Sequence, residues 1–155
     1  MHADVERLAF LLGTWTGEGR GEYPTISGFA YREEIRFSHN GKPFVGYVQR
    51  TWALDDGRPL HGESGYLRPV GPDGELEYVL VHPTGLAEIG GGRVVGGRVS
   101  LAARATRTPT ALAVEQVERD IEVVSDVLRY ELRMSMESVP LTRHLVGELH
   151  RTEEP

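Results

Sequence analysis

Alternation of apolar and polar side chains with a period of two is the feature that most constrains the fold of this chain. In the segment 29–37, four apolar residues take odd positions, and charged residues take the even positions from 32 to 36. The segment 128–136 repeats the pattern over five apolar residues. Because successive side chains of a strand point to opposite faces of a sheet, this period predicts half-buried β-strands.

Short turn signals separate the expected strands. Glycine-containing turns are indicated at Asn40–Gly41, Asp55–Gly57 and Gly71–Gly74. The segments expected to form strands are 29–37, 44–52, 60–69, 75–82, 86–89, 93–105 and 128–136. Together with shorter segments, this spacing indicates about nine or ten short strands joined by tight turns.

One short helix is expected, in the first dozen residues. Val5, Leu8, Ala9 and Leu12 have the spacing of an apolar helical face ahead of Gly13. Because no later segment supplies a helix to cover a sheet face, an all-β, antiparallel up-and-down barrel fits best, and its closure removes the sheet edges. A β-sandwich is the alternative. A barrel of about ten strands has more interior room than an eight-stranded barrel, which already holds one small ligand.

The composition narrows the function classes. The length suits a single domain, 1–155, and its 17 basic and 23 acidic residues give a net charge of −6. The basic residues are scattered, so we expect neither nucleic acid nor an anionic membrane as a partner. The sequence has no cysteine, which excludes disulfides, iron–sulfur clusters and cysteine nucleophiles. Without a signal peptide or an apolar run of roughly twenty residues, the chain is expected to be cytoplasmic.

The glycine-dense segment 13–21 is unlike a phosphate-binding loop. From Gly17 to Gly21 its glycines recur at every second position, and no helix follows to supply an N-terminus. Glycines at alternate positions of a strand allow a close approach on one face. Either a neighbouring strand or a bound ligand could make that approach.

The histidines are the remaining candidates for metal ligands or catalytic residues. His144 and His150 lie six residues apart, roughly 20 Å along a strand, so they cannot ligate one metal together. The chain lacks a helical His-Glu-x-x-His motif and a serine nucleophile elbow. On the residues alone, the chain is a barrel with an apolar cavity and up to three histidines near it, and the candidates are His61, His82, His144 and His150.

Several motifs resemble the nitrobindin family, in order and over nearly the whole chain. The segment Leu11–Gly19 matches the family's G-x-W-x-G-x-G signature, and Tyr23–Ile26 continues it. Further matching segments are Phe29–Glu34, Gly41–Phe44, Pro59–Arg68, His82–Gly85 and Pro140–Leu145.

The resemblance implies a ten-stranded antiparallel barrel, similar in shape to fatty-acid-binding proteins, with haem b at one end. The family's proximal histidine is matched here by His144. Nitrobindins bind nitric oxide and, as ferric haem proteins, convert peroxynitrite to nitrate. The resemblance therefore implies that this chain is a haem-dependent peroxynitrite isomerase whose ligands are haem and small nitrogen oxides.

The resemblance also suggests further site residues. His61 matches a histidine that lines the barrel interior in the family, Thr25 is expected to contact the haem, and His82 stands where some relatives carry glutamine. Apolar candidates for the haem cage are Tyr130, Leu132, Met134 and Met136.

Simple alternation conflicts with His144 as the ligand. It would turn Leu145 and Leu149 inward and His144 outward. A bend near Pro140 or the barrel rim is needed to reconcile the two.

A non-catalytic carrier of a fatty acid or similar apolar ligand is the alternative function. Carriers of this shape often clamp a carboxylate with an Arg-x-Tyr pair near the C-terminus. Here Arg129 and Tyr130 are adjacent and face opposite ways, which favours haem. A zinc hydrolase and a purely structural dimer module are the remaining alternatives, and a homodimer is the expected assembly.

Overall fold

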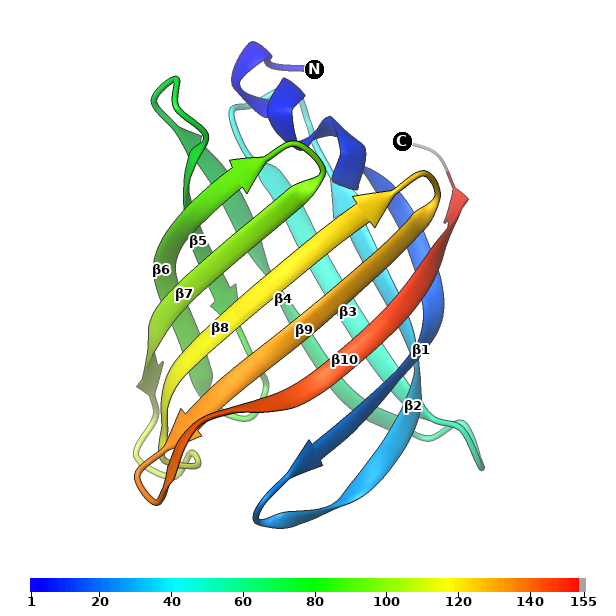
Figure 1. The fold of residues 1–155 in the computed structure, drawn as a ribbon, viewed down its shortest axis with the longest axis vertical. Coiled ribbons are helices and arrows are strands. Elements are labelled where there is room, and N and C mark those ends of the chain that lie inside the picture. Colours follow the sequence, from blue (N-terminus) through cyan, green and yellow to red (C-terminus); the bar gives the residue numbers. More distant parts are fainter. Residues whose placement is uncertain (154–155) are drawn as a thin grey trace.

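The computed structural model describes residues 1–153, and within them the chain forms a closed barrel of ten antiparallel strands (Figure 1). Each strand pairs with its neighbours in sequence, and β1 pairs with β10 to close the sheet. This confirms the up-and-down barrel and excludes the sandwich. The strands are β1 Gly13–Tyr23, β2 Ile26–Ser38, β3 Val45–Ala53, β4 Pro59–Val70, β5 Glu75–Val81, β6 Leu86–Val95, β7 Arg98–Arg107, β8 Val114–Val124, β9 Val127–Met136 and β10 Val139–Glu153.

The expected N-terminal helix is present as a 3₁₀ helix, η1, Ala3–Leu11. Its buried residues are Val5, Leu8 and Leu11, because side chains three residues apart eclipse each other in this helix type. The α-helical spacing expected from the sequence pointed to Ala9 instead of Leu11, and Ala9 is only partly buried. In the described part of the chain, no helix is both long and apolar enough to cross a membrane.

The helix closes one end of the barrel. The Trp15 indole donates a hydrogen bond of 2.7 Å to the Leu11 carbonyl oxygen. The Arg151 guanidinium lies 4.1 Å from the centre of the Trp15 ring and donates to the carbonyl oxygens of Phe10 and Leu12. The main apolar core fills the barrel beneath η1, with Leu8, Leu11 and Trp15 completely buried.

The boundary between β6 and β7 differs from the expectation. The turn lies at Gly96–Gly97, where Gly96 has a φ of 58°, and the glycines at 90–92 lie inside β6. A Cβ at Gly92 would lie 1.9 Å from the Ser100 carbonyl oxygen of β7. These glycines therefore allow close strand approach and do not end a strand.

Neighbouring strands also approach the alternate glycines of β1. A Cβ at Gly17 would lie 2.1 Å from the Glu148 carbonyl oxygen of β10, and one at Gly19 would lie 2.4 Å from the Tyr31 ring of β2. None of the glycines of 13–21 is among the residues that line the cavity described below.

Candidate functional site

A cavity of about 650 Å³ occupies the barrel at the end away from η1. Its volume falls within the range of roughly 300–1,000 Å³ that is usual for small-molecule and cofactor sites. Three leucines of its wall, Leu54, Leu60 and Leu112, are 42–70% exposed. Much of the remaining wall is also apolar and includes Leu86, Ala105, Val114, Val117, Leu132, Met134 and Leu145. The cavity therefore suits a largely apolar ligand.

His144 lines this cavity because of a β-bulge in β10. Arg143 pairs with Arg133 of β9, whereas Leu145 pairs with Leu132, so His144 is an extra residue without a partner opposite. Such a bulge re-aims the side chains around it. Both His144 and Leu145 reach the cavity, which resolves the conflict with simple alternation.

The protonation of the His144 ring follows from its contacts. Nδ1 lies 3.1 Å from the carbonyl oxygen of Glu22. Since a carbonyl oxygen can only accept, Nδ1 carries the proton and Nε2 keeps its lone pair. Burial lowers the pKa of His144, against the opposing effect of the Glu22 hydrogen bond. The Tyr23 ring stands edge-on at 5.2 Å between ring centres. His144 is thus a positioned neutral imidazole, the form that ligates metal ions.

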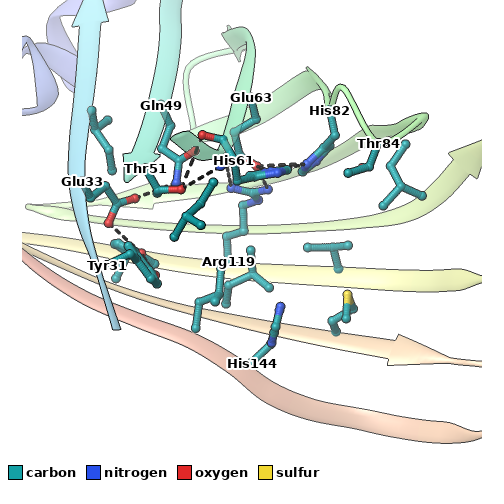
Figure 2. A pocket seen from close by; sticks show the side chains of 18 of the residues that line it. Tyr31, Glu33, Gln49, Thr51, His61, Glu63, His82, Thr84, Arg119 and His144 are labelled. Carbon is teal, nitrogen blue, oxygen red and sulfur yellow. Dashed lines mark hydrogen bonds and ion pairs between the residues drawn. The ribbon is translucent and has the colours of Figure 1, made fainter. Parts of the chain in front are cut away.

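A buried ion cluster lies across the cavity from His144 (Figure 2). Arg119 of β8 contacts Glu63 of β4 through Nη1 and Oε1 and Glu88 of β6 through Nη2 and Oε2, both at 2.5 Å. Burial opposes ionisation of the two carboxyls, yet the guanidinium lowers the pKa of Glu88 and holds that of Glu63 well below its usual range. The cluster therefore carries two carboxylates against one guanidinium.

Two histidines adjoin this cluster. His82, just after β5, lies 2.6 Å from Glu88 through Nε2 and Oε2, and its Nδ1 lies 3.2 Å from Glu63 Oε2. His61 Nε2 lies 3.1 Å from the same His82 Nδ1. The structure thus brings His61, His82 and His144 to one cavity, with His144 on the opposite wall.

A second polar group lies deeper in the barrel. Glu33 of β2 accepts hydrogen bonds from Gln49 Nε2 at 2.8 Å and from the Tyr130 hydroxyl at 2.7 Å. Burial raises the pKa of Glu33 to about 7, although both hydrogen bonds oppose the shift. Glu33 was not predicted from the sequence as a site residue. Its odd position among inward-facing residues of 29–37 was the available signal.

The family of this chain follows from a match to a protein-family model. Residues 4–151 match the family model described as "THAP4-like, heme-binding beta-barrel domain".

The chain belongs to this family.

Relatives and a solved structure agree with this classification. "Peroxynitrite isomerase 2" of Mycobacterium marinum is 48% identical over 97% of this chain and 96% of the relative. "Peroxynitrite isomerase" of Nocardia farcinica is 46% identical over 97% and 92%. The crystal structure of Rv2717c from M. tuberculosis superposes with a TM-score of 0.93, at 42% identity, over 98% of this chain and 99% of that one. The nitrobindin resemblance is confirmed, and haem is the expected cofactor of this THAP4-like barrel.

The cavity residues of this family member fit a haem. His144 supplies a nitrogen lone pair, and the wall combines apolar side chains with an exposed apolar rim. Of the residues expected at the site, Tyr130, Leu132, Met134 and His61 line the cavity. Met136 packs in the adjoining apolar cluster. Thr25 lies in the exposed turn between β1 and β2, outside the cavity lining, so its contact with haem stays a prediction.

Proposed function

We propose that this chain binds haem b in the cavity through Nε2 of His144, and that the haem-loaded protein isomerises peroxynitrite to nitrate. The observation that carries the proposal is the bulge that presents a neutral imidazole, protonated on Nδ1, to an apolar cavity. The names of relatives that are 46–48% identical over nearly the full chain support the reaction.

The residues around His144 would prepare it for ligation. The Glu22 carbonyl fixes the ring orientation and the tautomer, and the Tyr23 and Phe29 rings stand edge-on beside the imidazole. Because its ring is already held in place, the His144 side chain would lose little rotational freedom on binding the iron. The bound haem iron supplies the chemistry that rearranges peroxynitrite.

The remaining wall would hold the macrocycle and exclude water. Tyr130, Leu132 and Met134 supply cavity surface from β9, and Thr25 would approach from the β1–β2 turn. His61 stands on the opposite wall, so it would set the polarity of the cavity space between itself and His144. Small ligands such as nitric oxide and peroxynitrite would enter that space.

Among the described residues of the cavity lining, both arginines that could bind a fatty-acid carboxylate already have carboxylate partners. Arg119, the buried guanidinium of the cavity, is already paired with Glu63 and Glu88. Arg58, at the cavity mouth, is paired with Asp55 and Asp56. The arrangement therefore favours haem over a fatty acid.

The expected homodimer, the cytoplasmic location and the absence of nucleic-acid and membrane partners stay predictions from the sequence. Light scattering on the purified protein, with and without haem, tests the dimer directly.

The reaction is tested by mixing peroxynitrite with matched samples of haem-free and ferric haem-loaded protein. Only the loaded sample should accelerate peroxynitrite decay, with more nitrate formed and less nitration of an added phenol. Equal decay rates in the two samples would overturn the enzyme proposal and leave the haem-binding one to its own test.

A further inference from the structure

Three potential ligand atoms converge on the wall opposite His144. His61 and Glu63 lie two residues apart on β4, so they share the inward face, and His82 joins them from the end of β5. The His61 Nε2, His82 Nδ1 and Glu63 Oε2 atoms are separated by 3.1, 3.2 and 3.7 Å. On a tetrahedral metal with bonds of about 2.0–2.2 Å, ligand atoms lie about 3.4 Å apart.

Hydrogen bonds account for only part of this convergence, because a proton between His61 Nε2 and His82 Nδ1 leaves the contact of His82 Nδ1 with Glu63 Oε2 unsatisfied. His82 Nε2 is committed to Glu88 Oε2 at 2.6 Å, which leaves Nδ1 facing both His61 Nε2 and Glu63 Oε2. A proton on Nδ1 can point fully at only one of them, and a bare Nδ1 would oppose the lone pairs of the carboxylate. A cation between the three atoms would accept a lone pair from each.

The surroundings also suit a cation. Glu88 accepts from the far nitrogen of His82, the arrangement in which a carboxylate orients a metal-bound histidine. The buried Glu63 and Glu88 carry two negative charges, and Arg119 offsets one of them. A divalent ion would offset the remaining charge and the desolvation that burial imposes.

We propose that His61, Glu63 and His82 bind a divalent transition-metal ion of the zinc type, at a site distinct from His144. Two imidazole nitrogens and one carboxylate oxygen form a donor set that favours Zn²⁺ over Mg²⁺ or Ca²⁺. Three protein ligands leave a fourth position for water or a small anion. Since all three residues line the cavity, that position is reachable from the space in which haem is proposed to bind.

The test uses haem-free protein stripped with a chelator, so it does not depend on the proposed haem function. Calorimetric titration with Zn²⁺ alone should give one ion per chain, and Co²⁺ should give the intense visible bands of a tetrahedral complex. His82→Gln and His61→Gln should each weaken Zn²⁺ binding at least 100-fold. Glu88→Gln should weaken it by roughly 10–100-fold, because it removes only the orienting partner.

Two matched variants separate this site from other histidines. His39→Gln alters an exposed histidine beside a turn, and His144→Leu alters the opposite wall; both should keep the wild-type Zn²⁺ affinity. Circular dichroism of each metal-free variant establishes that it is folded. Failure of the wild type to bind one Zn²⁺, or wild-type affinity in a folded His82→Gln, would overturn the proposal. Loss of affinity in His144→Leu would also overturn it, by placing the ion on the other wall.

Discussion

The hydroxyl oxygens of Tyr31 and Tyr130 lie 2.5 Å apart, although the two residues stand on strands that are not neighbours. Between them, Gly19 of β1 pairs with Gly147 of β10, while Tyr31 pairs with Gly19 and Tyr130 with Gly147. The two rings therefore lean over a pair of glycines and meet above it. This row of four residues spans the seam where the barrel closes.

Replacing Gly147 with alanine should disturb this row. The new Cβ would lie 2.3 Å from the Tyr130 ring, which is also hydrogen-bonded to Glu33. We expect a loss of about 1–3 kcal/mol in the free energy of unfolding, measured in urea. Gly28→Ala is the control, because its Cβ would meet nothing closer than 3.7 Å. Equal stabilities of the two variants would contradict the packing argument.

Glu33 should make stability fall as pH rises through the weakly acidic range. Its pKa is raised by burial to about 7, against an ordinary value of 4.5. Between these values the folded protein holds a proton that the unfolded chain has released, so the free energy of unfolding decreases with increasing pH.

Glu33→Gln removes this titration. Relative to wild type, the variant should gain on the order of 2–3 kcal/mol between pH 4.5 and 7.5. Urea unfolding of both proteins across this range measures the difference. Parallel pH profiles would show that Glu33 titrates normally in the folded state.

Arg119→Met should be strongly destabilising near neutral pH. It leaves the buried carboxylates of Glu63 and Glu88 without their guanidinium, and breaking a buried pair typically costs about 3–5 kcal/mol. The triple variant with Glu63→Gln and Glu88→Gln should recover much of this loss, because no buried charge is left unpaired. Thermal melts compare the three proteins. A triple variant no more stable than Arg119→Met would indicate that packing, not charge, dominates.

His144→Leu should abolish the Soret spectrum of ligated ferric haem while the barrel stays folded. The substitution removes one hydrogen bond, to the Glu22 carbonyl, at a cost of about 1 kcal/mol. His150→Leu, on the same strand but with an exposed side chain, should leave the spectrum unchanged. A wild-type spectrum in the His144 variant would assign the ligand to another residue.

The architecture was predictable because its signals are local. Period-two alternation and turn residues can be recognised within short segments of sequence. The strands expected at 29–37 and 128–136 are observed there. The β6–β7 boundary was misplaced because the glycines at 90–92 resemble a turn. Glycine is required there because the backbone of β7 lies too close for a Cβ atom, and only strand pairing brings that backbone near.

Less of the candidate site than of the fold could be predicted from the sequence. The family resemblance pointed to His144, while alternation alone turned it outward, since a bulge depends on how β10 pairs with β9. The ion cluster was missed altogether. Arg119 lies 56 residues from Glu63 and 31 from Glu88, and only closure of the barrel brings these charges together.

The helix η1 and the last described residues share one end of the barrel (Figure 1), where Thr14 pairs with Glu153. The exposed leucines of the cavity wall lie at the other end. Attachment through either terminus would therefore leave the ligand entrance facing solution. A surface tether, a fluorescent reporter or a fused enzyme could be joined there without blocking access. The same geometry would allow a sensor for the cavity's ligands to be immobilised with its entrance facing the sample.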